Sequence, residues 1–260
     1  MDNNAAKKSL GQHWLNDEAS LEAMCDAVEV GAGDTILEVG PGHGSLTAKL
    51  LDRGAKVVAV ELDGYLVDAA QEKFKGREFE VTQESILDFD LTALQGGYKV
   101  VANIPYYLTS NLLRMLCEST NSFSQAALLI QKEVAERVAA EPGDMGILSV
   151  TVQFYCDVGL GPVIGAELFS PPPKVDSQIL MLDYRGPKFA DVDVQKFFGL
   201  VKAGFSERRK MLRSSLSGGL HIPKEEATLL LQKAQIPPTA RAQELSLDQW
   251  HQLFISHHQK

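Results

Sequence analysis

The sequence predicts an α/β fold built on a parallel β-sheet, followed by a small all-helical C-terminal domain. Between residues 35 and 184, short apolar runs of strand length alternate with amphipathic stretches of helical period, which is typical of a parallel sheet with helices on both faces. Beyond Arg185-Gly186-Pro187 the strand patterns stop and only helical patterns continue. We therefore expect a first domain over residues 1–185 and a helical domain over residues 186–260.

The individual elements are predicted from apolar periodicity and from the glycines, prolines and polar residues between them. After a helix over residues 18–30, strands are expected at residues 35–39, 56–60, 79–82, 99–102, 126–130, 147–155 and 179–184. The helices between them are expected at residues 45–52, 65–74, 110–116 and 132–139. In the second domain, breaks at residues 217–219 (SGG) and 236–238 (IPP) predict three to five helices.

Composition argues against several classes of protein. Of the 260 residues, 45% are hydrophobic and 23% are charged, which is ordinary for a globular protein. No apolar run approaches the ~18 residues of a membrane span, and the N-terminus does not resemble a signal peptide, so we expect a cytoplasmic protein with no membrane partner. Cys25, Cys117 and Cys156 show no metal-ligand spacing, which predicts buried thiols in a reducing compartment and no metal site.

The charge distribution predicts one basic surface on an acidic protein. The formal net charge is −9, which argues against non-specific coating of nucleic acid. Residues 196–213, however, contain six lysines or arginines and one glutamate. Such a stripe is either a solvated helix face or a binding site for nucleic-acid phosphates, and we favour the second. Its candidate phosphate-binding residues are Lys202, Arg208, Arg209, Lys210 and Arg213.

A glycine-rich loop, residues 40–44 (GPGHG), lies between the first predicted strand and its helix. Ligands of open α/β sheets bind at this position, and glycine lets the backbone approach them closely. The dinucleotide fingerprint requires a glycine at position 45, where Ser45 stands, so a nicotinamide oxidoreductase is disfavoured. The spacing suits a cofactor without a pyrophosphate. S-adenosylmethionine is the leading candidate, with Gly40 and Gly42 as contacts, and a purely structural turn is the alternative.

Polar residues also follow the next two predicted strands. Glu61 stands at the end of the second strand, where a carboxylate can accept hydrogen bonds from both ribose hydroxyls of an adenosine moiety. Asp63, two residues later, is interpreted as a helix cap. After the third strand, Glu84 and Ser85 are alternative acceptors for an adenine amino group.

The tetrapeptide Asn103-Ile104-Pro105-Tyr106 follows the fourth predicted strand. Asn103 offers a neutral oxygen acceptor, Pro105 is rigid and donates no backbone hydrogen bond, and Tyr106 offers a flat face for stacking. This combination suits a planar base that carries an amino group. The tetrapeptide and the three preceding motifs all fall at the carboxyl ends of successive strands. We therefore expect a functional site on one rim of the sheet rather than four unrelated turns.

A rigid segment is expected at residues 169–175 (FSPPPKV), because three consecutive prolines favour an extended backbone. It is either a plain linker or a support that presents Phe169 and Lys174 at fixed positions. Lys174 joins the candidate phosphate-binding residues.

Together these motifs resemble the KsgA/RsmA family of small-subunit (16S) ribosomal RNA adenine dimethyltransferases over nearly the whole chain. The segments that carry the resemblance are residues 8–15, 40–44, 103–106, 169–175, 205–210 and 241–246. The resemblance implies a Rossmann-like class I S-adenosylmethionine-dependent methyltransferase domain and a helical domain that binds RNA. It also implies that His13 and Leu15 close over the cofactor, that Gly40 approaches its methionine end and that Glu61 binds its ribose. Ser85 stands where the family usually has an aspartate.

The implied reaction is methyl transfer to the N6 amino groups of two adjacent adenosines in the 3′-terminal hairpin loop of small-subunit ribosomal RNA, giving N6,N6-dimethyladenosine. The implied partner is this RNA within a pre-assembled small subunit, and the enzyme is expected to act as a monomer in subunit biogenesis. As a mechanism, Asn103 and a backbone carbonyl of Ile104 or Pro105 would accept the two N–H bonds of the amine. Tyr106 and Phe169 would stack on opposite faces of the extruded base.

Two other functions compete with this interpretation. An erythromycin-resistance-type methylase that modifies large-subunit RNA shares the catalytic motifs, but its C-terminal region does not usually resemble residues 202–213 or 241–246. A non-catalytic RNA-binding assembly factor of the same fold is the second alternative. The intact residues 103–106 and Glu61 argue against a loss of catalysis.

Overall fold

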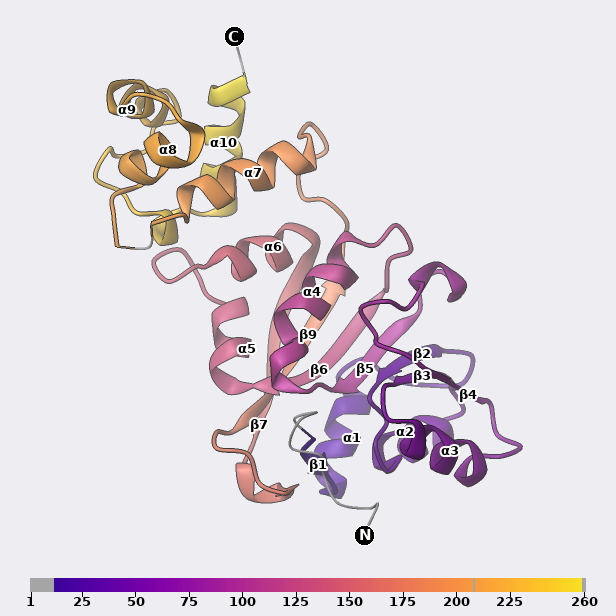
Figure 1. The fold of residues 1–260 in the computed structure, drawn as a ribbon. Helices are drawn as coiled ribbons and strands as arrows, with labels where there is room; N and C mark the ends of the chain where they lie inside the picture. Colours follow the sequence, from indigo (N-terminus) through magenta and orange to yellow (C-terminus); the bar gives the residue numbers. More distant parts are fainter. Residues whose placement is uncertain (1–11, 208, 259–260) are drawn as a thin grey trace. The chain divides into compact units, whose positions relative to one another are not determined.

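The computed structural model describes residues 12–207 and 209–258, which form two compact units. The first unit comprises the chain up to Ala135 together with Asp157–Tyr184, and the second comprises Glu136–Cys156 together with the chain from Arg185 onward (Figure 1). The chain enters the second unit for the last time between Tyr184 and Arg185, next to the boundary expected after residue 185. Glu136–Cys156, expected in the first domain, groups with the second unit.

The first unit contains a seven-stranded sheet with the order β4-β3-β2-β5-β6-β9-β7. The strands are β2 (Thr35–Val39), β3 (Lys56–Glu61), β4 (Phe79–Gln83), β5 (Lys99–Asn103), β6 (Gln125–Gln131), β7 (Cys156–Ile164) and β9 (Ser177–Tyr184). The strands from β4 to β6 are mutually parallel, as predicted, whereas β9 runs antiparallel to β6. The sheet is therefore mixed: the expected parallel arrangement holds from β4 to β6 and changes at β9.

The strand order creates a crevice beside β2. The chain leaves β2 for β3 on one side and later returns to β5 on the other side. The loops that follow β2 and β5 therefore diverge, and ligands of α/β sheets bind at such a switch point, outside the carboxyl ends of the strands.

Helices cover both faces of the sheet. Successive strand residues point to opposite faces, and the adjacent residues Ile36 and Leu37 are both fully buried. On one face, α1 (Glu18–Asp26), α2 (Ser45–Asp52) and α3 (Gly64–Lys73) contribute to the same apolar cluster as Ile36. On the other face lies α4 (Thr109–Glu118), which buries its own leucines (Figure 1). α5 (Lys132–Val138) follows β6.

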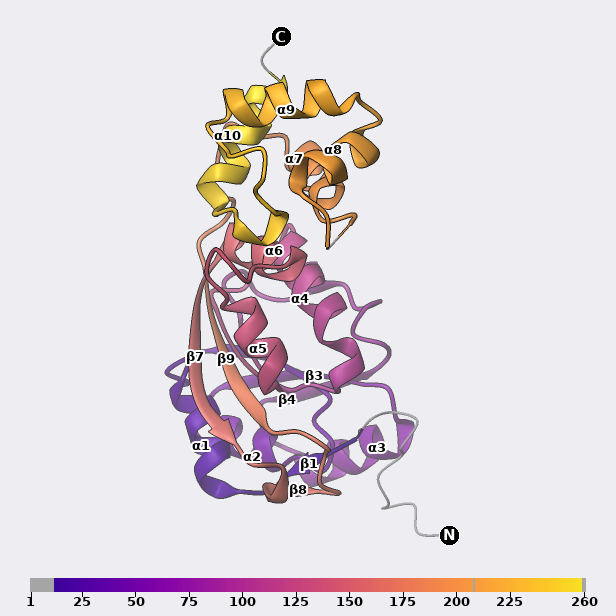
Figure 2. The same cartoon turned by 90° about the vertical axis from the view of Figure 1, so that its left-hand side faces the viewer.

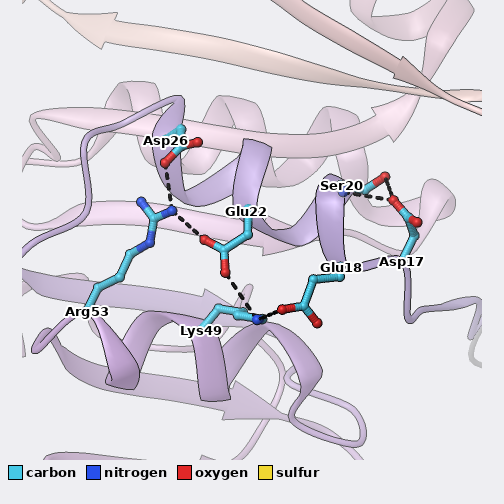
Figure 3. Close-up of polar contacts among 7 residues, drawn as sticks. All are labelled: Asp17, Glu18, Ser20, Glu22, Asp26, Lys49 and Arg53. Carbon is cyan, nitrogen blue, oxygen red and sulfur yellow. Dashed lines mark hydrogen bonds and ion pairs between the residues drawn. The ribbon is translucent and has the colours of Figure 1, made fainter.

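Ion pairs fasten α1 to α2, as Figure 3 shows. Lys49 of α2 pairs with Glu18 and Glu22 of α1. One turn further along, Arg53 pairs with Glu22 at 2.5 Å and with Asp26 at 2.6 Å. The side chains of Lys49 and Arg53 are only 21% and 24% exposed, so these pairs are partly shielded from solvent. α1 is thereby fixed against the helix that follows the glycine loop.

The segment Ile147–Tyr155 is the helix α6, not the predicted strand. Most of its side chains are buried, so the apolar residues do not show the helical period of an amphipathic helix. The edge strand β7, which follows it, was not predicted because Gly159 and Gly161 weaken its strand pattern. Added Cβ atoms there would lie 2.9 Å and 3.1 Å from side-chain atoms of β9, so the glycines permit close packing.

The second unit is helical, with a core of aromatic side chains that includes Phe154, Phe197 and Trp250. Besides α6 it contains α7 (Val194–Gly204), α8 (Leu212–Leu220), α9 (Lys224–Lys233) and α10 (Leu247–His258), shown at the top of Figure 2. Short elements elsewhere are β1 (Trp14–Leu15), β8 (Phe169–Ser170), η2 (Leu91–Ala93), η3 (Tyr106–Leu108), η4 (Ala166–Leu168) and η5 (Ala242–Glu244). Over the described ranges, no helix is both long and apolar enough to cross a membrane.

Of the two predicted breaks in this unit, the one at residues 236–238 is confirmed, between α9 and α10. The break predicted at residues 217–219 is wrong, because these residues lie inside α8, which ends at Leu220 and is capped by His221 with φ of 56°. Gly219 serves packing rather than a turn. A Cβ at Gly219 would lie 2.7 Å from the Cα of Ala203 in α7.

The close approach of α7 and α8 predicts that Gly219→Leu destabilises the protein. Overpacking of this kind costs about 1–3 kcal/mol, so thermal unfolding followed by circular dichroism should show a lower Tm. Gly218→Leu is the matched control, since a Cβ there meets only a Glu207 oxygen at 3.8 Å. Equal Tm values for the two variants would contradict this account of the helix contact.

Candidate active site

A cleft of about 280 Å³ opens at the carboxyl ends of β2, β3, β4 and β5. All of its lining residues belong to the first unit, and they come from the N-terminal segment, the glycine loop and the loops after β3, β4 and β5. They are Gln12, His13, Trp14, Val39, Gly40, Gly42, Val60, Glu61, Leu62, Glu84, Ser85, Ile86, Leu87, Asn103, Ile104, Pro105, Tyr106, Tyr107 and Leu108. The four sequence motifs predicted to share one rim do meet here.

The glycine loop exposes its backbone to the cleft. Gly40 has φ of +68°, and a Cβ there would meet no atom within 4 Å, so this position is open toward a ligand. Gly44 has φ of +76°, and a Cβ there would lie 2.6 Å from the Phe74 ring. The loop therefore needs glycine for two different reasons, an open surface at Gly40 and close packing at Gly44.

Glu61 is a buried carboxylate at the edge of the cleft. Its Oε1 atom accepts hydrogen bonds from the backbone amides of Leu62, at 2.8 Å, and Asp63, at 2.9 Å. Burial raises the pKa of Glu61, and these backbone donors oppose that effect. The Gly42 amide is a further backbone donor to this carboxylate. A carboxylate has about four acceptor positions, so Glu61 keeps acceptor capacity for ligand hydroxyls. Asp63 caps α3 by accepting from the Tyr65 amide, which confirms its interpretation as a helix cap.

Glu84 and Ser85 both line the cleft, beside the side chains of Leu62, Ile86 and Leu87. The Ser85 hydroxyl accepts a hydrogen bond from the Leu87 amide at 3.2 Å. An apolar wall with polar groups at its end suits a flat heteroaromatic ring with an amino substituent. The predicted adenosine half of the cofactor fits this part of the cleft.

Asn103 is oriented by the N-terminal segment. Its Nδ2 atom donates a hydrogen bond to the carbonyl oxygen of His13 at 2.9 Å. A carbonyl only accepts, so the amide nitrogen must face His13, and Oδ1 is left as an acceptor. The Pro105 carbonyl already accepts from the Leu108 amide at 2.9 Å. The Ile104 carbonyl is therefore the better candidate for the second acceptor.

Tyr106 is half-buried beside Asn103. Its hydroxyl is hydrogen-bonded to the Ser177 hydroxyl at 2.8 Å, and its ring stacks on the His13 ring with centroids 5.9 Å apart. Burial raises the pKa of the phenol. Ser177 was not identified from the sequence. It lies at this rim because β9 is antiparallel and therefore begins, rather than ends, at the carboxyl ends of the other strands.

Phe169, the predicted partner of Tyr106 across a base, lies apart from the residues that line the cleft. Phe169 is 4% exposed, belongs to the apolar core and is not among the residues that line the cleft. The physical reason is the pairing of β8 with β1, in which Phe169 lies opposite Leu15. Leu15 is equally buried and lines only a smaller cavity of about 40 Å³ beside the glycine loop.

The candidate phosphate-binding residues that the structure describes lie outside the cleft. Lys174 is exposed in the first unit, whereas Lys202, Arg209 and Lys210 are exposed and Arg213 is half-exposed in the second unit. Arg208 lies outside the described residues.

The sheet order, with a glycine loop and a buried carboxylate at its rim, identifies the first unit as a Rossmann-like domain of an S-adenosylmethionine-dependent methyltransferase. The family of ribosomal RNA adenine dimethylases matches residues 3–259. The chain therefore belongs to the ribosomal RNA adenine dimethylase family.

Individual relatives agree with this assignment. Ribosomal RNA small subunit methyltransferase A of Dehalococcoides mccartyi (strain CBDB1) is 40% identical over 97% of this chain and 88% of that protein. The protein of the same name from Clostridium botulinum (strain ATCC 19397 / Type A) is 38% identical over 95% of this chain and 92% of that protein.

Two solved structures are similar over nearly the whole chain. A dimethyladenosine transferase from Plasmodium falciparum has a TM-score of 0.79 at 26% identity, covering 93% of this chain and 96% of that one. The 23S rRNA methyltransferase ErmE has a TM-score of 0.74 at 25% identity, covering 94% and 98%.

The buried Glu38 predicts a pH-dependent stability. Glu38 is 1% exposed and accepts a hydrogen bond from the Thr47 hydroxyl at 2.7 Å. Burial raises its pKa from 4.5 to about 8, so the folded state binds more protons than the unfolded state between these pH values. The stabilising contribution is complete below pH 4.5 and is lost as the pH rises through 8.

The variant Glu38→Gln keeps an acceptor for Thr47 but cannot ionise. Without cofactor, its Tm should exceed that of the unchanged protein at pH 8.5, with a smaller difference at pH 5.5. A Tm difference independent of pH would contradict the assigned ionisation of Glu38.

Proposed function

We propose that this enzyme transfers methyl groups from S-adenosylmethionine to the N6 atoms of two adjacent adenosines in the 3′-terminal hairpin loop of small-subunit ribosomal RNA. The observation that carries the proposal is the orientation of Asn103, whose oxygen remains as an acceptor in a cleft that Ile104 also lines. An exocyclic amine presents two N–H donors, and this site presents two acceptors for them.

The residues of the cleft fit the cofactor. Gly40 provides an open backbone for its methionine end, Glu61 the acceptor for its ribose, and Glu84 and Ser85 alternative acceptors for its adenine. When bound, S-adenosylmethionine supplies an electrophilic methyl group. No acidic or basic catalyst needs to act on the cofactor itself, so the chemical task of the chain concerns the target amine.

Asn103 and the Ile104 carbonyl localise the lone pair of the target amine. In free adenine this lone pair is delocalised into the ring, so the amine is a poor nucleophile. Two hydrogen bonds to the acceptors favour a pyramidal nitrogen and direct its lone pair at the methyl group. Neutral acceptors suffice because the nitrogen loses its proton only after it has gained the methyl group. The rate enhancement then comes from positioning and preorganised dipoles.

Tyr106 supports the extruded base by stacking. A target base must leave its RNA stack before it can enter a cleft of this kind, and aromatic side chains compensate for the lost stacking. After the first transfer one N–H remains on the nitrogen. One of the two acceptors can still orient it, so the same site accommodates a second methylation.

We favour small-subunit RNA as the substrate because of the names of the most similar relatives reported above. Proteins about 40% identical to this chain are named small-subunit methyltransferases, whereas the 23S enzyme ErmE is 25% identical. We propose further that the enzyme acts in the cytoplasm as a monomer on a pre-assembled subunit, with phosphate contacts from Lys174, Lys202, Arg209, Lys210 and Arg213.

Transfer of labelled methyl groups tests the proposal. Small subunits purified without this modification and naked large-subunit RNA are offered separately, and modified nucleotides are identified by mass spectrometry. N6,N6-dimethyladenosine at two adjacent positions in the small subunit is the expected product. Label in large-subunit RNA alone would favour the resistance-type activity, and no label in either would favour an assembly factor.

Removal of the Asn103 amide is predicted to abolish transfer. Asn103→Ala should lower kcat by on the order of 10²–10³-fold, as expected for a transition-state hydrogen bond. Calorimetry with S-adenosylmethionine should show that cofactor binding is largely retained. Undiminished transfer by this variant would remove Asn103 from the mechanism.

Charge reversal in the second unit is predicted to weaken RNA binding. For Arg209→Glu/Lys210→Glu, the slope of log K against log salt concentration should flatten by roughly 1–2, since each lost phosphate contact changes it by about 0.7–0.9. Lys224→Glu/Lys233→Glu makes the same charge change on α9 and is the matched control. Equal slopes for the two double variants would show that Arg209 and Lys210 do not contact phosphates.

A further inference from the structure

We propose that Ser177 is a positioning residue for methyl transfer, which holds the Tyr106 phenol and thereby fixes the ring on which the target base stacks. This inference rests on the proposed function in one respect, the contact of Tyr106 with the base. It adds a residue outside the cleft lining, contributed by a strand that is distant in sequence from residues 103–106.

The position of Ser177 in the sheet makes it a rigid anchor. It is the first residue of β9 and pairs with Gln131 at the end of β6. It is fully buried, and a buried hydroxyl without a hydrogen-bond partner is costly. The Tyr106 hydroxyl, at 2.8 Å, satisfies it. Because β9 is paired on both sides, with β6 and with β7, the sheet holds Ser177 in place.

Tyr106, by contrast, is the first residue of a short element, η3, which leads directly into α4. η3 spans only Tyr106–Leu108, and its backbone is held by hydrogen bonds from the Leu108 amide to the Pro105 carbonyl and from the Thr109 amide to the Tyr106 carbonyl. The Tyr106 ring is half-buried, and its neighbour Tyr107 is 62% exposed. A ring in this setting has freedom to rotate toward solvent unless its far end is held.

Two contacts hold the Tyr106 ring at different places. The hydrogen bond to Ser177 holds the ring at its hydroxyl end, and the His13 ring stacks on it at 5.9 Å. Fixing the ring before the base arrives removes conformational freedom that binding would otherwise have to remove. We therefore expect Ser177 to act on the stacked base through Tyr106 and to leave cofactor binding unchanged.

A double-mutant cycle of Ser177→Ala and Tyr106→Phe tests this coupling. Each variant removes one end of the same hydrogen bond, so each should lower kcat/KM for small subunits by on the order of 2–10-fold, the effect of one neutral hydrogen bond. The double variant should be no worse than either single variant, because the shared interaction is lost only once. Ser177→Thr keeps the hydroxyl and should restore activity.

A stacking measurement supplies a readout independent of catalysis. In an RNA hairpin with 2-aminopurine at the target position, stacking on Tyr106 should quench the fluorescence of that base. Ser177→Ala should quench this fluorescence less than the unchanged enzyme does. Ser149→Ala is the control for loss of a buried serine, since Ser149 is fully buried and bonded to the Arg137 carbonyl in the other unit. It should lower Tm without changing quenching.

The outcomes separate this inference from the proposed function. Multiplicative losses in the double variant, or a Ser177→Ala variant with unchanged kcat/KM and quenching, would overturn the role of Ser177 while leaving the methyltransferase intact. Failure of the unchanged enzyme to methylate any adenosine would overturn the proposed function instead. If the unchanged enzyme methylates no adenosine, equal quenching of 2-aminopurine fluorescence by the unchanged enzyme and by Ser177→Ala would overturn the positioning role as well.

Discussion

The hydrogen bond from the Asn103 amide to the His13 carbonyl joins two segments that are 90 residues apart, and the chemistry of the cleft depends on it. An asparagine side chain can present either its oxygen or its nitrogen to a ligand. Only the oxygen can accept from an amine, and the backbone carbonyl of His13 selects that orientation. In the proposed mechanism, the N-terminal segment is therefore part of the catalytic geometry, and it also lines the cleft.

Several independent contacts hold this segment in place. Trp14 and Leu15 pair with β8, and the His13 ring is hydrogen-bonded to the Pro171 carbonyl at 2.7 Å. α1, which follows directly, is fastened to α2 by the ion pairs of Lys49 and Arg53. Exposed ion pairs contribute little to stability singly, but these share partners in a partly shielded network. The proline-rich segment, residues 169–175, thus supports the site through the contact of Pro171 with His13. Its phenylalanine, Phe169, belongs to the apolar core.

Much of this site could be predicted because local patterns determine it. The glycine loop, Glu61 and residues 103–106 each follow a recognisable strand, and parallel strands bring their carboxyl ends to one rim. The positions of Phe169 and Ser177 could not be predicted in this way. Phe169 is turned inward by the pairing of β8 with β1, and Ser177 reaches the rim through the antiparallel direction of β9. Both depend on pairing between segments far apart in sequence, which periodicity does not reveal. The helix at Ile147–Tyr155 was mistaken for a strand because burial on most sides hides its period.

The variant Asn103→Asp tests the central role of amide orientation most directly. Aspartate has nearly the same shape and keeps an acceptor oxygen, but it cannot donate to the His13 carbonyl, and its ionised oxygen is repelled by that carbonyl. We predict that single-turnover methyl transfer to small subunits is nearly as slow in Asn103→Asp as in a variant without the side chain, while S-adenosylmethionine still binds. Transfer by Asn103→Asp at a rate close to that of the unchanged enzyme would show that an acceptor alone suffices and would contradict the account.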